Sequence, residues 1–255
     1  MRATIPVLVM PTLEVLREQE LDEARMIQNS LVPTESLQIG KLGVTHRLQP
    51  VHEVGGDFLD YFALSDQTIG LYLGDVAGKG LPGALYAALV VGTLRGVHKT
   101  GQSPAAVLSL LNRRLCVRAI PSRYSAVSYA VFDPSSRQMH ISSAGMYGPL
   151  LLTRRGCVNL RLSGMPPGLF ANAQYDVSTV AIEPGESVLF ITDGIAEMRK
   201  SDSGILGVEH LIDICARLYT EEPAKLLDIV FAAAEEADPN NQSDDRAAVV
   251  FHLAE

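Results

Sequence analysis

Short β-type runs separated by turn residues fill the chain from Gly43 onward, and they leave few folds open to it. The runs read GVTHRL, FLDYFAL, TIGLYLGD, AVSYAVFD, QMHIS, PLLLT, VSTVAI, SVLFIT and AAVVFHL. Several neighbouring runs are joined by turns of hairpin length, at residues 65–67 and 133–136 for example. Because so short a connection joins antiparallel strands and has no room for a crossover helix, the pattern predicts antiparallel sheets.

Helical segments interrupt these runs in pairs. One helix is predicted from about Pro82 to His98, and the next begins with Ser103 as N-cap and Pro104 at the first helical position. A later pair reads GVEHLIDICARLY and PAKLLDIVFAAAEEA, and the last strand follows it. Strand runs that alternate with helix pairs predict an α+β domain in which helices cover antiparallel sheets.

A further helix is predicted near the N-terminus, from Thr12 as N-cap to about residue 31. Its apolar seam consists of Leu21, Ala24, Ile27 and Leu31. Two interpretations fit this segment: a solvated helix that lies against the domain, or a linker that dimerises. Glu20 and Glu23 interrupt the seam, so any coiled coil formed by this helix would be short.

The composition narrows the class of protein. The chain has 255 residues, 47% of them hydrophobic and 20% charged, which excludes disorder, and it lacks an apolar run long enough to span a membrane. Its net charge of −8 argues against nucleic acid as a partner. Three widely spaced cysteines form no CxxC pair, and residues 1–11 lack a signal-peptide cleavage site. We therefore expect a cytoplasmic protein.

Charge is distributed unevenly along the chain. The interval 76–132 contains no Asp or Glu, and the rest of the chain carries a net charge of −15. Seven cations lie in that interval: Lys79, Arg95, Lys99, Arg113, Arg114, Arg118 and Arg123. They are either ordinary surface residues or a docking surface for an anionic partner.

Four aspartates stand at or beside the ends of predicted strands, next to Gly or to a second acid. They occur in Gly55-Gly56-Asp57, Gly74-Asp75, Thr192-Asp193-Gly194 and Asp244-Asp245. Any single Asp-Gly pair is typical of a plain turn. Four carboxylates that the fold collects would repel one another, and a hard divalent cation such as Mg²⁺ or Mn²⁺ would compensate their charge.

Other chemistries find little support. Gly78, Gly80 and Gly83 match the dinucleotide pattern GxGxxG, but no acidic residue follows about 20 positions later and the hairpins argue against a parallel sheet. The sequence has no GxSxG elbow, no HExxH and no kinase motifs. Its six histidines show no ligand spacing.

The motifs taken together resemble those of the bacterial SpoIIE/RsbU-type branch of the PP2C (PPM) serine/threonine phosphatases. They are EARMIQNSLVP, VGGDFLDYFAL, IGLYLGDVAGKGLPGALYAA, SAGMYGPLLL, FITDGIAEMR and DDRAAVVF, from about residue 23 to residue 253. Their shared order and spacing make the resemblance specific. It implies a PP2C-like antiparallel β-sandwich flanked by helix layers at residues 36–255, after an N-terminal linker or regulatory helix at residues 1–35.

The resemblance also implies a metal site with two Mn²⁺ or Mg²⁺ ions. Asp75 would bridge the ions, with the Val76 carbonyl completing one of them, and Asp57 would bind that same ion. Asp193 and Asp244 would bind the other, while Asp245 and Gly56 would be supports. These aspartates would act through a metal-bound water that attacks a phosphoserine or phosphothreonine. Substrate-binding residues are unknown, with Lys79 and Arg95 as the candidates.

The same resemblance implies a place in bacterial signal transduction. The expected substrate is a phosphorylated STAS-domain anti-anti-sigma factor or a similar phosphoprotein, in a partner-switching pathway of sigma factor regulation and stress response. An upstream sensor or regulator would act through the N-terminal helix, which is also consistent with a homodimer. The alternative function is a non-catalytic PP2C-like module that binds a partner.

Overall fold

The strands pair as the hairpin-length turns predict, with every neighbour antiparallel. The structure, a computed structural model, describes residues 12–64, 68–98, 101–200, 204–205, 207–239 and 244–255. Within them, one sheet has the order β1-β2-β13-β10-β7-β8, with bounds Leu37–Ile39, Leu42–Gln49, Arg246–Leu253, Ser187–Ile191, Leu150–Thr153 and Gly156–Asn159. A second has the order β3-β4-β5-β6-β9, with bounds Phe58–Ala63, Ile69–Val76, Ser125–Asp133, Gln138–Ala144 and Ser178–Ala181. A two-stranded ribbon joins β11 (Arg199–Lys200) to β12 (Gly204–Ile205).

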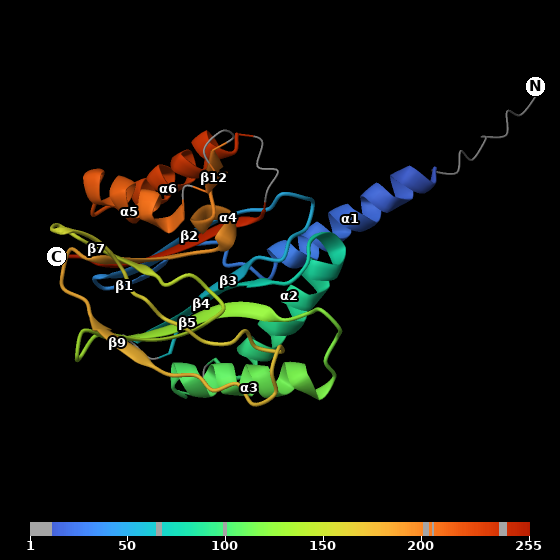
Figure 1. The fold of residues 1–255 in the computed structure, drawn as a ribbon, viewed down its shortest axis with the longest axis horizontal. Helices are drawn as coiled ribbons and strands as arrows, with labels where there is room; N and C mark the ends of the chain where they lie inside the picture. The colour runs from blue at the N-terminus through green and yellow to red at the C-terminus, as the bar shows by residue number, and fades with distance from the viewer. Residues whose placement is uncertain (1–11, 65–67, 99–100, 201–203, 206, 240–243) are drawn as a thin grey trace, which may run out of the picture.

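The two large sheets stack face to face and helices cover their outer faces (Figure 1). The helices are α1 (Leu13–Asn29), α2 (Gly80–Arg95), α3 (Pro104–Val117), α4 (Asp193–Ala196), α5 (Gly207–Arg217) and α6 (Pro223–Ala237). Helices α2 and α3 lie on the β3–β9 sheet, and α5 and α6 lie on the β1–β8 sheet. The predicted α+β sandwich with flanking helix layers is confirmed.

Side-chain alternation along the strands explains the three hydrophobic cores. In β13, Val249 and Phe251 point into the core between the sheets, while Ala248 and Val250 point toward α5 and α6. In β4, Tyr72 points instead toward α2 and α3. Because both faces of each sheet are covered, the central strands are apolar on both faces, and their sequences read as nearly continuous apolar runs.

The helix boundaries agree closely with the sequence predictions. Thr12 caps α1, its hydroxyl accepting a hydrogen bond from the Val15 amide, and Ser103 caps α3 in the same way. Helix α6 has the predicted bounds. None of the helices in the described residues is long and apolar enough to cross a bilayer.

The N-terminal helix differs from the predicted seam. Ile27 is 66% exposed, whereas Gln28 is half-buried in its place. Helix α1 projects from the body of the molecule (Figure 1), and none of its residues is fully buried. The predicted hairpin turn at residues 65–67 lies outside the described residues, although β3 and β4 pair antiparallel on either side of it.

Candidate metal centre

All four predicted aspartates lie at one end of the sandwich. Asp57 immediately precedes β3, and Asp75 lies near the end of β4, where the two strands pair. Asp193 begins α4 directly after β10, and Asp244 lies two residues before β13, the neighbour of β10. Because antiparallel neighbours bring the end of one strand beside the start of the next, each sheet contributes one pair of aspartates.

Thr192 joins the two sheets at this end. Its hydroxyl is fully buried and donates a hydrogen bond of 2.8 Å to Asp57 Oδ2. The Thr192 hydroxyl oxygen also accepts a hydrogen bond of 2.9 Å from the Ala247 amide. Asp57 is 3% exposed, and its other oxygen, Oδ1, is buried without a hydrogen-bond partner. Such an orphaned carboxylate oxygen is costly to bury, which favours a bound cation as its partner.

Asp245 holds the backbone on either side of the loop before Asp57. Its two carboxylate oxygens accept hydrogen bonds from the Val51 amide (2.8 Å) and the Gly56 amide (2.7 Å). A Cβ atom on Gly55 would lie 2.2 Å from Asp245 Oδ2, so only glycine fits at this approach. The loop that leads into Asp57 is therefore fixed by a carboxylate from the opposite sheet.

Gly56 leaves open the space in front of Asp75 and Val76. A Cβ atom on Gly56 would lie 2.8 Å from Asp75 Oδ1 and 3.2 Å from the Val76 carbonyl oxygen. These are the two oxygens that the resemblance assigns to the metal site. Ser125 holds the backbone beside them, since its hydroxyl donates to the Asp75 carbonyl at 3.1 Å.

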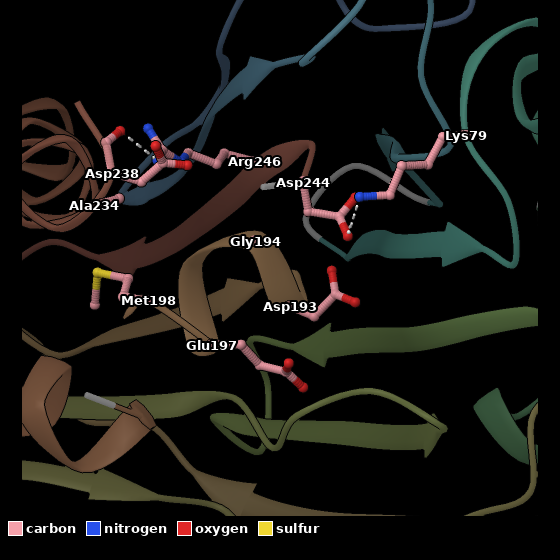
Figure 2. Close-up of a pocket in the computed structure, with 9 residues that line it drawn as sticks. All are labelled: Lys79, Asp193, Gly194, Glu197, Met198, Ala234, Asp238, Asp244 and Arg246. Atoms are coloured by element: carbon pink, nitrogen blue, oxygen red, sulfur yellow. Dashed lines mark hydrogen bonds and ion pairs between the residues drawn. The ribbon is translucent and has the colours of Figure 1, made fainter. Parts of the chain in front are cut away.

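Asp193 and Asp244 line a cavity of about 340 Å³, which we call the aspartate pocket. Its lining consists of Lys79, Asp193, Gly194, Glu197, Met198, Ala234, Asp238, Asp244 and Arg246. Figure 2 shows the carboxylates of Asp193 and Asp244 directed into the same space. The Lys79 ammonium lies 2.9 Å from Asp244 Oδ2 and provides positive charge beside it.

The raised pKa values of the aspartates show which of these side chains are neighbours in space. Burial raises the pKa of Asp57 well above its usual range, and the strongest repulsion on it comes from Asp75. Burial and then Asp193 raise the pKa of Asp75 to about 7. Burial and then Asp244 raise the pKa of Asp193 to about 6. The four carboxylates thus form a chain of repelling neighbours from one sheet to the other.

The carboxylates do not close around a single point. In the described part of the chain, no three carboxylate, imidazole or thiol side chains form a ready ligand group. Asp57 and Asp245 line a second cavity of about 380 Å³, whereas Asp193 and Asp244 line the aspartate pocket. The donor chemistry nevertheless fits hard divalent cations, because every donor is an oxygen, the cluster is anionic and Asp57 Oδ1 lacks a partner.

The structure separates the two candidates for substrate binding. Lys79 lines the aspartate pocket. Arg95 does not, because its guanidinium is held elsewhere by Asp60 Oδ2 (2.8 Å) and by the Leu31 carbonyl (2.8 Å). Arg95 therefore joins α2 to β3 and to the end of the α1 segment.

Three contacts at this site were not predicted from the sequence. Thr192 and Gln28 act through hydrogen bonds between residues far apart in the chain, and Arg246 lies at the far end of the aspartate pocket beside Asp238 (Figure 2). Gln28 sits at helical spacing beside the apolar seam of α1. For the Gln28 contact, this polar residue beside an apolar seam was the one signal in the sequence.

Comparison with known proteins identifies the family. The sequence matches the family Stage II sporulation protein E (SpoIIE) over residues 65–254. The chain belongs to the SpoIIE family. This is the PP2C-type phosphatase family of RsbU, and the phosphoserine phosphatase RsbU of Bacillus subtilis is 26% identical over 196 residues, which cover 74% of this chain and 56% of RsbU.

Solved structures show the same fold. The SiaA-PP2C domain of Pseudomonas aeruginosa superposes with a TM-score of 0.82 at 21% identity, covering 95% of this chain and 99% of that domain. The PP2C phosphatase domain of SpoIIE from Bacillus subtilis, solved with a fragment of its regulatory domain, gives a TM-score of 0.76 at 16% identity, covering 87% of this chain and 63% of that one. The SpoIIE-family chain described here spans 38% to 56% of the length of three curated relatives that it matches.

Proposed function

We propose that this chain hydrolyses phosphoserine or phosphothreonine esters on a regulatory protein in a reaction that requires two Mn²⁺ or Mg²⁺ ions. The observation that carries the proposal is the chain of repelling aspartates with the orphaned Asp57 Oδ1 at one end. The geometry supports Asp57, Asp75 and the Val76 carbonyl as one group of ligands. Asp193 and Asp244, which face one space, form the other group.

The residues around the aspartates position them for this role. When bound, divalent cations supply Lewis-acid chemistry, activate water and screen the phosphate charge. Thr192 fixes the rotamer of Asp57, and Asp245 fixes the loop before it. Lys79 pairs with Asp244 and adds a positive charge to the lining of the aspartate pocket, which favours an anionic substrate there. No side chain of this chain needs to form a covalent intermediate.

The decisive experiment measures phosphate release from a phosphoserine peptide during titration with Mn²⁺ in otherwise metal-free buffer. Asp75→Ala and Asp193→Ala should each reduce release by at least about 100-fold, because the metal ligands are lost. Asp213→Ala, which changes an exposed aspartate on α5, is the matched control and should retain full release. Circular dichroism should show that all three variants fold.

Either of two results would overturn the proposal. One is full activity in Asp75→Ala. The other is no release by the unaltered chain at any Mn²⁺ concentration, together with a stable complex with an unphosphorylated partner, which would favour a PP2C-like binding module.

We further propose that the substrate is a STAS-domain anti-anti-sigma factor, with α1 within residues 1–35 as the regulatory element of a phosphatase domain at residues 36–255. The exposed apolar side chains of α1 support a role in contacting a regulator or a second copy; they are Leu13, Val15, Leu16, Met26 and Ile27. Sedimentation of the chain before and after removal of residues 1–30 would test the homodimer, which should dissociate on truncation.

A further inference from the structure

The seven cations in the acid-free interval 76–132 have different surroundings in the structure. Lys79 pairs with Asp244 and Arg95 pairs with Asp60. The Arg123 guanidinium donates to the Ala77 carbonyl, and Lys99 lies outside the described residues. The remaining three, Arg113, Arg114 and Arg118, are exposed and form no ion pair with any carboxylate of the described chain.

These three arginines share the C-terminal end of α3 with exposed apolar side chains. Val117 is 76% exposed and Ile120 is 50% exposed. Residues four apart lie one above the other on a helix, so Arg113 lies beside Val117. Arg118 is the residue that ends the helix. We call Arg113, Arg114, Val117, Arg118 and Ile120 the α3-end surface. Helix-dipole stabilisation explains a cation in the last turn, but it explains neither Arg118 beyond the helix nor the apolar residues between the charges.

The segment after α3 leads directly to the aspartates. The Tyr124 carbonyl accepts a hydrogen bond of 3.0 Å from the Ala77 amide, two residues beyond Asp75. Gly78, with φ +116°, leaves room for the Arg123 guanidinium, which a Cβ atom at Gly78 would overlap. Strand β5 then begins at Ser125, and its Ala126 pairs with Asp75. The α3-end surface is therefore at the same end of the sandwich as the candidate metal centre.

A second exposed apolar segment is fastened beside α3. The buried side chain of Asn112 accepts from the Gly168 amide at 2.8 Å and donates to the Phe170 carbonyl at 2.9 Å. The segment it holds presents Leu169 and Phe170, which are 45% and 49% exposed. Aromatic residues and arginine are enriched in protein–protein interfaces, so this combination of exposed side chains is typical of a surface that binds another protein.

We propose that the α3-end surface docks an acidic face of the phosphoprotein substrate and presents its phosphorylated residue to the aspartates. The inference rests on the proposed function. Charge complementarity supports this inference, because a chain of net charge −8 repels acidic partners except where positive charge is concentrated. The apolar residues among the arginines favour a protein surface over nucleic acid.

The test compares two phosphoserine peptides of equal length, one flanked by glutamates and the other by lysines. The readout is the ratio of their kcat/KM values, each normalised to the turnover of para-nitrophenyl phosphate by the same variant. The unaltered chain should prefer the acidic peptide by about tenfold at low salt, and the preference should shrink as salt screens the charges. Arg113→Glu/Arg114→Glu/Arg118→Glu should abolish or reverse it.

The matched control is Lys41→Glu/Arg155→Glu/Lys225→Glu, which makes the same change in net charge at exposed positions on other elements and should keep the preference. An equal acidic preference in the α3-end variant would overturn the proposal.

Binding of the acidic peptide in metal-free buffer, followed by fluorescence anisotropy, separates this inference from the proposed function. Binding by the unaltered chain and its loss in the α3-end variant would support the docking surface even if no phosphate is released. Tighter binding of a single-stranded oligonucleotide of equal charge would overturn it in favour of nucleic acid.

Discussion

Asp57 and Asp245 are both buried aspartates at the same end of the sandwich, yet their surroundings give them different tasks. Asp245 satisfies both oxygens with backbone amides, so its charge is used to hold a loop. Asp57 has one hydroxyl donor and one orphaned oxygen, so it needs a further partner. The sequence distinguished them only through the family resemblance, because two adjacent aspartates and a Gly-Gly-Asp turn carry no record of which amides they meet.

The first prediction concerns the effect of Lys79 on metal binding. Its ammonium occupies the position beside Asp244 that favours positive charge, and it competes there with a cation. Lys79→Met should tighten the binding of Mn²⁺ by about fivefold, a small effect because the lysine is half exposed and screened by water. Isothermal titration calorimetry measures the affinity, with Arg155→Met as the control. Weaker binding in Lys79→Met would contradict the competition.

At the scale of elements, α1 contacts the loop before Asp57 through Arg25, which donates to the Glu53 carbonyl at 3.0 Å, and through Gln28. Gln28 Nε2 donates to the Gly55 carbonyl at 2.7 Å, and Gln28 Oε1 accepts from the Gly55 amide at 3.0 Å. This pair of hydrogen bonds grips the loop that precedes Asp57. It also explains why Gln28, and not Ile27, is half-buried in α1: the backbone of the loop offers it two partners.

The Gln28 contact predicts that α1 tunes the metal centre. Gln28→Ala should lower the free energy of unfolding by about 1–2 kcal/mol through the two lost hydrogen bonds and weaken the binding of Mn²⁺ several-fold. Gln19→Ala, an exposed position on the same helix, is the matched control. Unchanged affinity for Mn²⁺ in Gln28→Ala would show that Asp57 is positioned without the Gln28 contact.

Helix α2 contains two glycines whose surroundings predict opposite effects. A Cβ atom on Gly83 would lie 2.3 Å from the Gly78 carbonyl oxygen, whereas a Cβ atom on Gly92 would have no atom within 4 Å apart from its chain neighbours and the backbone of its own helix. Gly83→Ala should destabilise the protein by about 2 kcal/mol through overpacking, and Gly92→Ala should stabilise it by about 1 kcal/mol through higher helix propensity. Urea unfolding measures both. A stabilising Gly83→Ala would mean that the loop after Asp75 yields easily.

The elements differ in how far the sequence predicts them. Helix α6 and the central strands carry strong periodicity or long apolar runs, and their predicted bounds hold. Strands β1 and β8 and helix α4 have three or four residues each, too few for a pattern to emerge. The aspartates were predicted, but their separation into two cavities depends on contacts between the sheets, such as that from Thr192 to Asp57, which spacing does not encode.

At the scale of the whole molecule, the two sheets bring together at one end aspartate carboxylates that repel one another. Burial and mutual repulsion raise the pKa of Asp75 to about 7 and the pKa of Asp193 to about 6, against about 3.9 in an unfolded chain. Between about pH 4 and pH 7, the folded protein therefore holds protons that the unfolded chain has released. Stability must fall as the pH rises through this range, because unfolding releases protons.

The last prediction uses this linkage. In buffer containing a chelator, the unaltered chain should lose about 5 kcal/mol of stability between pH 4.5 and pH 8 relative to Asp75→Asn/Asp193→Asn, in which these two groups no longer titrate. Mn²⁺ should raise the melting temperature of the unaltered chain more at pH 7.5 than at pH 5, because at the lower pH protons already neutralise the carboxylates. The double variant should respond little to Mn²⁺ at either pH. A melting temperature that rises equally at both pH values would mean that Mn²⁺ binds away from the aspartates, and the stability of this end of the sandwich would then need another explanation.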